Sequence, residues 1–354
     1  MRSMRGPLGC LYGMGAVARR AAYRRGWLRQ QRLGRPVVSV GNLTAGGTGK
    51  TPLVRWLAER LERAGLRPAI LTRGYRRGPG PDAIVIPPES GRRPRARDVG
   101  DEAAWLARAL PAVPIGVGAD RFRTGRLVEA DFSVDVFILD DGFQHLALAR
   151  DLDAVTLDAT QPLSDAAILP AGLQREPCSA LARADVVVVT RTELTGPVSV
   201  EAPVEAVVRR INPGAPLIRE RTRLDHLVDV ASEAAQSVSQ SAAAWAGRPV
   251  HAFCGIGNPE AFFRDLRLWG FNAVRESVFP DHHVYRDLRF AAAGEAAALV
   301  TTEKDAMNLE GLDLTEVGVP VLVCCARLAP EDEAAFDEIL FARLGYSRVP
   351  AASV

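Results

Sequence analysis

Lysine is almost absent from this sequence: of 44 basic residues, only Lys50 and Lys304 are lysines. Cysteine is also scarce: the chain has five, an odd number, and no two of them have CxxC spacing. This pattern argues against a disulfide framework and a zinc site, and it is typical of a reducing compartment. The chain also lacks the apolar run of about 18 residues that a membrane-spanning helix needs, so we expect no span.

The 354 residues, 47% of them hydrophobic, can bury a sizeable core. Because single cores stop growing at about 250–300 residues, this length predicts two domains. Short, nearly continuous β-branched runs alternate with helical patterns, which predicts a parallel sheet covered on both faces. The runs are residues 37–40, 69–72, 83–86, 115–117, 134–139, 154–157, 185–190, 249–254, 273–279, 297–302 and 319–324.

The net charge of +2 is unevenly distributed. Residues 1–35 contain nine arginines and no acidic residue, so the rest of the chain has a net charge of −7. Apolar residues alternate with these arginines as in a basic amphipathic helix on an anionic membrane surface, and Tyr12 and Trp27 favour that interface. A solvated helix, or one that touches nucleic acid, stays open. A signal peptide would need a longer apolar stretch, and a transit peptide more serine.

Lys50 lies in a glycine-rich segment that follows the apolar run at residues 37–40 and precedes an amphipathic helical pattern. Such a segment turns backbone N–H groups toward phosphate oxygens, while the compact ammonium follows the β- and γ-phosphates and a threonine hydroxyl binds magnesium. The usual motif begins with glycine where this chain has threonine; the alternative is a plain glycine-rich turn. The predicted loop consists of Thr44, Ala45, Gly46, Gly47, Thr48, Gly49, Lys50 and Thr51.

The predicted fold class is therefore α/β: a P-loop NTPase-like parallel sheet flanked by helices, with a second, smaller α/β domain. Residues 1–35 would form the basic helix and residues 36–230 the nucleotide-binding domain. The Ser-, Ala- and Gln-rich stretch within residues 231–247 would be a linker, and residues 248–354 would form the smaller domain.

Asp140 and Asp141 follow the run at residues 134–139 and resemble a Walker B element. At the carboxyl edge of the sheet, one of them should hold magnesium and the other can orient Lys50 or a catalytic residue. The alternative is an Asp-Asp-Gly turn that closes a strand.

Phosphoryl transfer also needs a base and arginines near the transferred group. Asp101 is a candidate base, although spacing alone favours first-turn capping of a helix as its explanation. Arg121 and Arg175, each beside an acid, could be ordinary surface ion pairs. His282 or His283 could act in acid–base chemistry or lie in a polar loop. The residues around Lys304 lack the order expected for guanine recognition, which favours ATP.

Several blocks together resemble the tetraacyldisaccharide 4′-kinase family, the lipid A kinases of Gram-negative bacteria. The blocks occur in the family's order over almost the whole chain, and the family has threonine at the position of Thr44. They are residues 40–52, 72–75, 99–102, 140–145, 169–172, 175–177, 253–259, 279–285 and 301–305.

The resemblance implies phosphorylation, by ATP and Mg²⁺, of the 4′-hydroxyl of a tetraacylated glucosamine disaccharide 1-phosphate. This lipid A precursor lies at the cytoplasmic face of the inner membrane, so the enzyme would be peripheral or monotopic there. Asp101 would be the base and His282 its partner, with Lys50 on the phosphates and Asp140 as orienter. The implied metal site is Thr51, Asp141 and Glu176, and the implied substrate or supporting residues are Arg121, Gln144, His145 and Arg175.

Two other functions remain open: a P-loop kinase of another hydroxyl-bearing lipid or metabolite, and a membrane-associated nucleotide switch that transfers phosphate to no acceptor. We expect neither a nucleic acid nor a protein partner.

Overall fold

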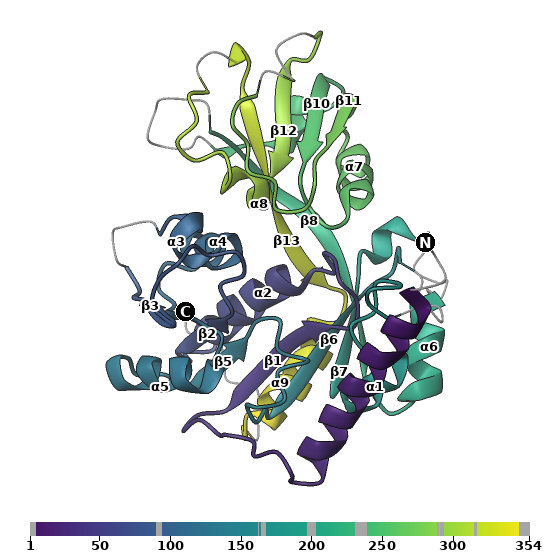
Figure 1. The fold of residues 1–354 in the computed structure, drawn as a ribbon. Helices are drawn as coiled ribbons and strands as arrows, with labels where there is room; N and C mark the ends of the chain where they lie inside the picture. The colour runs from purple at the N-terminus through teal and green to yellow at the C-terminus, as the bar shows by residue number, and fades with distance from the viewer. Residues whose placement is uncertain are drawn as a thin grey trace.

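The computed structural model describes residues 5–89, 94–161, 163, 168–196, 203–230, 239–288, 290, 294–314 and 317–346. A larger domain, at the bottom of Figure 1, and a smaller one above it are joined by two long strands, β8 (Leu217–Asp229) and β13 (Val321–Pro330). These strands pair with each other in antiparallel fashion, and they also pair with β7 in the larger domain and β12 in the smaller one. A single sheet therefore runs through both domains in the described part of the chain.

The sheet of the larger domain has the strand order β7-β6-β1-β5-β2-β4-β3. Neighbours from β7 to β4 are parallel, and β3 is antiparallel to β4 at the edge. Most of these strands are buried throughout, as expected for aliphatic runs covered on both faces. The strands are β1 (Val37–Asn42), β2 (Pro68–Thr72), β3 (Ala83–Ile86), β4 (Ile115–Gly118), β5 (Val136–Leu139), β6 (Leu152–Asp158) and β7 (Val186–Thr190).

Helical layers cover both faces of this sheet. Val38 and Val40 of β1 pack in one core cluster with α2 (Lys50–Arg63), α4 (Asp101–Ala109) and α9 (Glu333–Arg343). Alternate side chains of the same strands pack against other helices on the opposite face. These are α5 (Arg121–Asp131), α6 (Pro203–Ile211) and the 3₁₀ helix η1 (Cys178–Arg183). Short elements α3 (Ala96–Val99) and η2 (Thr192–Leu194) precede α4 and follow β7.

The predicted basic helix is present as α1 (Arg5–Arg24), which lies on the outside of the larger domain (Figure 1). Gly9 and Gly13 let it approach the segment at Ile168, because a Cβ on either glycine would lie within 3 Å of that residue. None of the helices in the described ranges combines the length and hydropathy that a bilayer crossing requires.

The smaller domain continues the sheet in the order β11-β10-β12-β13, with every pair parallel. One core cluster contains Trp245, Phe262 and Phe263, and a second contains the edge-to-face pair Phe253 and Tyr285. The remaining elements are β9 (Ser239–Gln240), η3 (Ala242–Trp245), β10 (Pro249–Cys254), α7 (Pro259–Leu268), β11 (Asn272–Val278), β12 (Ala298–Thr302) and α8 (Glu303–Ala306).

The predicted fold class is confirmed, but the observed domain limits differ from those predicted. Strand β8 was not expected, because charged residues interrupt it and most of its side chains are partly exposed. Residues 231–238 of the predicted linker lie outside the described residues, and Trp245 belongs to the smaller core. After β13 the chain returns to the larger domain, where Phe336 of α9 contacts Trp56 of α2 edge-on.

Helix α9 is held to the larger domain by a buried ion pair as well as by apolar packing. Arg60 of α2 donates from Nε and Nη2 to Asp337 Oδ2, at 2.8 and 2.5 Å, and both side chains are 9% exposed. The same guanidinium lies over the ring of Phe341. Removal of the carboxylate would therefore leave a desolvated cation with a poorer partner.

We expect Asp337→Ala to lower the free energy of unfolding by about 3 kcal/mol, because it removes one member of a buried pair. Chemical denaturation measures this change. In the control Asp82→Ala, an ion pair with Arg123 is lost at the surface, where the side chains are 66% and 89% exposed. That change should stay within about 0.5 kcal/mol. Equal losses in both variants would contradict the anchoring role of Asp337.

Candidate active site

A cleft of about 880 Å³ lies between the two domains. The larger domain contributes the predicted phosphate loop, the carboxyl ends of several strands, and Tyr12 and Arg19 of α1. The smaller domain contributes the loops after β10 and β11 and the start of α8. The position agrees with the general rule that ligands bind beyond the carboxyl ends of parallel strands.

The phosphate loop connects the end of β1 to the start of α2, which begins at Lys50. Gly46 and Gly49 have φ angles of 128° and 81°, which side chains other than glycine adopt only under strain. Asn42 Nδ2 donates to Thr48 Oγ1 at 2.8 Å, and that hydroxyl also contacts the hydroxyl of Thr156. These side-chain contacts with β1 and β6 fix the loop. The N-terminus of α2 directs N–H groups and positive potential into the cleft.

Asp141 faces the phosphate loop, as one of the two predicted aspartates should. Its Oδ1 lies 3.6 Å from Lys50 Nζ, and both of its oxygens accept from Arg175, at 2.8 and 2.7 Å. Burial alone would raise the pKa of Asp141, but the charges of Lys50 and Arg175 lower it below its ordinary value. Asp141 is therefore a carboxylate, a form that can hold a cation.

Magnesium fits this place only with help from other ligands. Among the described residues, no three His, Cys, Asp or Glu side chains lie together as a metal site. Thr51 and Asp141 both line the cleft beside Lys50. Because Mg²⁺ in phosphate-binding enzymes keeps water and takes phosphate oxygens, one hydroxyl and one carboxylate are a sufficient protein contribution.

Asp140 is placed differently from its neighbour. It is 1% exposed, accepts a 3.3 Å hydrogen bond from Thr72 Oγ1, and its Oδ1 has no partner among the described residues. Burial, together with the nearby carboxylates of Glu102 and Asp141, raises the pKa of Asp140 to about 7. The ion pair with Lys50 is thus made by Asp141, and the orienting role of Asp140 stays a prediction.

Asp101 and His282 are brought into contact from the two domains. Asp101 is the first residue of α4, and its Oδ2 is hydrogen-bonded to His282 Nδ1. The imidazole lines the cleft and the carboxylate lies behind it. Burial would raise the pKa of Asp101, but the hydrogen bond from His282 and the charge of Lys304 lower it below its ordinary value. The pair can thus accept a proton from a group in the cleft.

The other predicted residues divide into two groups. Arg121, Gln144, His145 and Arg175 line the cleft. Burial and neighbouring arginines lower the pKa of His145 to about 4, so this ring is neutral near pH 7. Glu176, in contrast, is 5% exposed and accepts from Arg183 with both oxygens, at 2.7 and 3.0 Å. It lies outside the cleft lining, so the metal role expected for Glu176 has no support from its position.

The structure adds residues that sequence reasoning missed. Arg191 donates to Gly47 O at 2.8 Å and also binds Asp158, and Asp158 accepts from Asn258 Nδ2 of the smaller domain at 2.9 Å. Thr190 Oγ1 donates to Thr48 O. A signal was present, since Asp158 directly follows one predicted strand and Thr190 ends another, at the edge where ligands bind.

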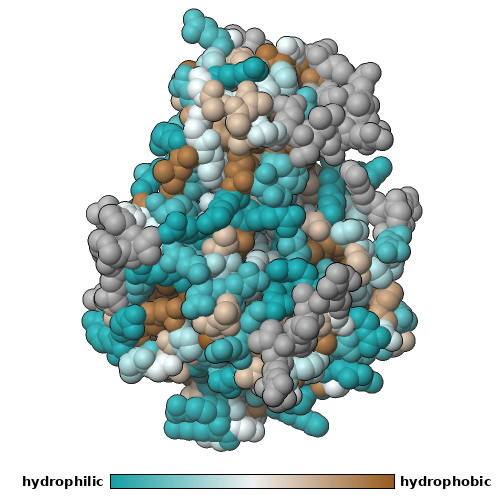
Figure 2. Space-filling view, turned by 180° about the vertical axis from the view of Figure 1, so that it is seen from behind, coloured by the Kyte–Doolittle hydropathy of each residue, from teal (hydrophilic) through white to brown (hydrophobic). Residues whose placement is uncertain are grey.

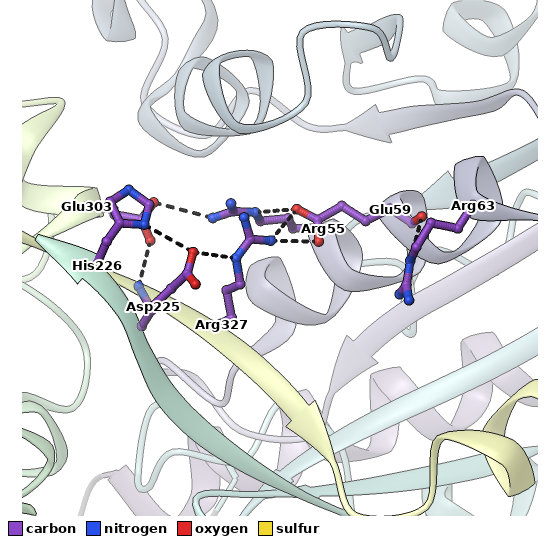
Figure 3. A network of polar contacts seen from close by, with 8 residues as sticks. Arg55, Glu59, Arg63, Asp225, His226, Glu303 and Arg327 are labelled. Carbon is purple, nitrogen blue, oxygen red and sulfur yellow. Dashed lines mark hydrogen bonds and ion pairs between the residues drawn. The ribbon is translucent and has the colours of Figure 1, made fainter. Parts of the chain in front are cut away.

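A polar network connects α2 to β8 and β13, the two strands that join the domains (Figure 3). Arg327 of β13 donates to both oxygens of Glu59 and to Asp225 of β8. Arg55, on the same helix as Glu59, binds that glutamate and lies 3.4 Å from Glu303 of α8. The helix that begins at Lys50 is therefore fixed against both connecting strands and the smaller domain.

Comparison with known proteins identifies the family. Residues 1–345 match the family model for tetraacyldisaccharide-1-P 4′-kinase, LpxK. The chain belongs to this family. The tetraacyldisaccharide 4′-kinase of Halorhodospira halophila is 40% identical over 312 residues, covering 86% of this chain and 83% of the relative. That of Pelobacter propionicus is 38% identical over 340 residues, covering 94% and 90%.

A solved structure agrees with the sequence relatives. The crystal structure of the "apo" form of LpxK from Aquifex aeolicus in complex with ATP has a TM-score of 0.77 and 30% identity, covering 97% of this chain and 99% of that one. The resemblance predicted from the sequence blocks is thereby confirmed, as is the predicted α/β fold class. Because the chain belongs to the LpxK family, it is a phosphotransferase, and the interdomain cleft is its candidate active site.

The loop after β10 in the smaller domain packs closely against the phosphate loop at Gly257. A Cβ on Gly257 would lie 2.7 Å from Gly47 N and 3.1 Å from Gly46 Cα. We expect Gly257→Ala to push the two loops apart and to increase amide hydrogen exchange of residues 45–49 several-fold, about the effect of a local opening made easier by 1 kcal/mol. In the control Gly214→Ala the new methyl group meets nothing within 4 Å. Unchanged exchange in Gly257→Ala would contradict the contact.

Proposed function

We propose that this protein transfers the γ-phosphoryl group of ATP to the 4′-hydroxyl of a tetraacyl disaccharide 1-phosphate, the reaction that its family is named for. One observation carries the proposal: the Asp101–His282 pair faces the same cleft as Lys50. A phosphate-binding lysine and a base in one cleft are the two parts that transfer to an alcohol requires. A nucleotide switch would have no need of an interdomain base.

The phosphate loop and its neighbours would bind ATP. The N–H groups at the start of α2 and the ammonium of Lys50 would hold the phosphates, and Thr51 and Asp141 would hold magnesium. Magnesium, when bound, neutralises phosphate charge. Arg121 and Arg175 line the cleft and can stabilise charge on the transferred group.

The geometry refines the assignment of the base. The resemblance names Asp101 as the base and His282 as its partner. Because the imidazole faces the cleft and the carboxylate lies behind it, we assign proton acceptance to His282 and orientation of the ring to Asp101. The same division of roles occurs wherever a carboxylate holds a histidine by Nδ1 and leaves Nε2 for the substrate.

The test is transfer of labelled γ-phosphate from ATP with Mg²⁺ to tetraacyl disaccharide 1-phosphate in detergent micelles. We expect product from the wild type, and a loss of about 10²–10⁴-fold for His282→Gln and Asp101→Asn with ATP affinity retained. Lys50→Ala should lose ATP affinity as well. ATP turnover without lipid product in the wild type would overturn the acceptor assignment and favour the nucleotide switch.

We further propose that α1 docks the enzyme on the cytoplasmic face of the inner membrane, where an acyl-bearing substrate stays. Met14 and Val17, three positions apart on α1, are 61% and 40% exposed, and Trp27 beyond the helix is 72% exposed. Arg19, Arg20 and Arg24 follow the first two on the same helix, and helices that bind anionic bilayers likewise combine arginines with apolar residues. The opposite face of the molecule carries small, separate hydrophobic patches outside the atoms drawn in grey (Figure 2).

Membrane docking predicts that Met14→Glu/Val17→Glu reduces co-flotation with vesicles containing anionic lipid, because it places acids among lipid phosphates. We expect roughly a 30-fold weaker partition, because two charges at about 1 kcal/mol each at the surface amount to about 2 kcal/mol. The control Leu127→Glu changes an exposed apolar residue of α5, 43% exposed, away from α1. Equal flotation of both variants and the wild type would rule out docking through α1.

A further inference from the structure

Lys304 is the second lysine of a chain that otherwise uses arginine, and its side chain also lies in the cleft. It belongs to α8, whose first turn is capped by Thr302 accepting from Asp305 N at 3.1 Å. The Nζ atom donates to Asp281 Oδ1 at 2.9 Å and lies 3.3 Å from His282 Nε2. Lys304 therefore contacts the one ring nitrogen that Asp101 leaves available.

The chemistry of these contacts fixes the tautomer of His282. An ammonium group only donates hydrogen bonds, so the Nε2 atom facing Lys304 must offer its lone pair. The proton of the neutral ring is then on Nδ1, from which it is donated to Asp101. A carboxylate on one side and an ammonium on the other thus select a single tautomer with its lone pair toward the cleft.

We propose that Lys304 is a positioning residue for phosphoryl transfer, which holds His282 in the Nδ1–H tautomer, with Nε2 ready to accept a proton. This inference rests on the proposed kinase function. When the acceptor binds, its hydroxyl replaces Lys304 at Nε2, while Asp281 retains the ammonium. The hydroxyl proton passes to Nε2, the acceptor oxygen bonds to the γ-phosphorus, and the bond from that phosphorus to the β–γ bridging oxygen breaks.

The surroundings of Lys304 are fixed in a way that suits this role. Glu303, the residue before it, lies 3.4 Å from Arg55 of α2 and accepts from Ala326 N of β13 at 3.3 Å (Figure 3). Helix α8 is thereby held against the helix that begins at Lys50. A planar guanidinium at this position would carry the same charge on a wider group, whereas an ammonium is a compact point charge.

The charges around the Asp101–His282 pair give the sign of the expected pH effect. Lys304 and Asp281 face it from the smaller domain and Glu102 from α4; Arg76 donates to the carbonyl oxygens of residues 281 and 282. The lysine charge lowers the pKa of Asp101 and opposes addition of a proton to the pair. Without it, the pair binds a proton at higher pH, and activity is lost earlier on the acidic side.

The test compares Lys304→Met and Lys304→Arg with the wild type in the micelle assay across pH. For Lys304→Met we expect kcat to fall about ten-fold or more, with the KM for ATP little changed. The acidic limb of kcat/KM should move up by about half a pH unit or more, since a unit charge near the pair is removed. Lys304→Arg keeps the charge, so its acidic limb should stay near the wild-type position.

A second readout needs no turnover. The ¹⁵N spectrum of the wild type should show His282 as one tautomer, and the Lys304→Met spectrum should show a mixture; only five histidines occur, and His282→Gln assigns the signal. If Lys304→Met does not fold, as judged by thermal unfolding, Lys304→Gln replaces it. An unchanged acidic limb together with a single tautomer would overturn the proposal. A wild type without lipid product would overturn the kinase function instead, and the tautomer measurement still decides the role of Lys304.

Discussion

The hydrogen bond between Asp101 and His282 requires the two domains to be held in a fixed relative arrangement, and the rest of the structure maintains that arrangement. Its two partners belong to different domains, so it exists only when those domains lie in one particular arrangement. A 13-residue strand, β8, and a 10-residue strand, β13, supply the connection, and their antiparallel pairing is stiffer than a flexible linker would be. The network of Arg327, Glu59 and Asp225 then fixes this connection to α2.

The positions at which this chain has arginine or lysine can be explained by the shapes of the two charged groups. Arginine is used where a carboxylate is held by two hydrogen bonds, as Arg219 holds Glu205 and Arg175 holds Asp141. Lys50 and Lys304 stand at the two places in the cleft where a small, mobile cation must face a reacting group. The near absence of lysine elsewhere makes these two positions stand out in the sequence itself.

Local patterns in the sequence were enough to predict the strands with continuous aliphatic runs, the glycine-rich loop after β1 and the α/β fold class, whereas the kinase family came from the resemblance of whole blocks. Strand β8 was missed because most of its side chains are partly exposed and arginines and acidic residues interrupt its apolar residues, a pattern that resembles a loop. The placement of α9 against α2 depends on a contact across 277 residues, Arg60 to Asp337, and no local signal encodes it. The contact of Asp101 with His282 was expected only through family resemblance, because 181 residues separate them.

The phosphate loop is also the surface on which the smaller domain rests. Gly257 lies against the backbone of Gly46 and Gly47, and Asn258 is linked through Asp158 to Arg191, which holds Gly47 O. Any ligand that orders this loop therefore also favours the domain arrangement that joins Asp101 to His282. By thermodynamic linkage the reverse holds, so that this domain arrangement also favours the ordered loop. The contacts at the phosphate loop and the Asp101–His282 hydrogen bond therefore both require the same arrangement of the two domains.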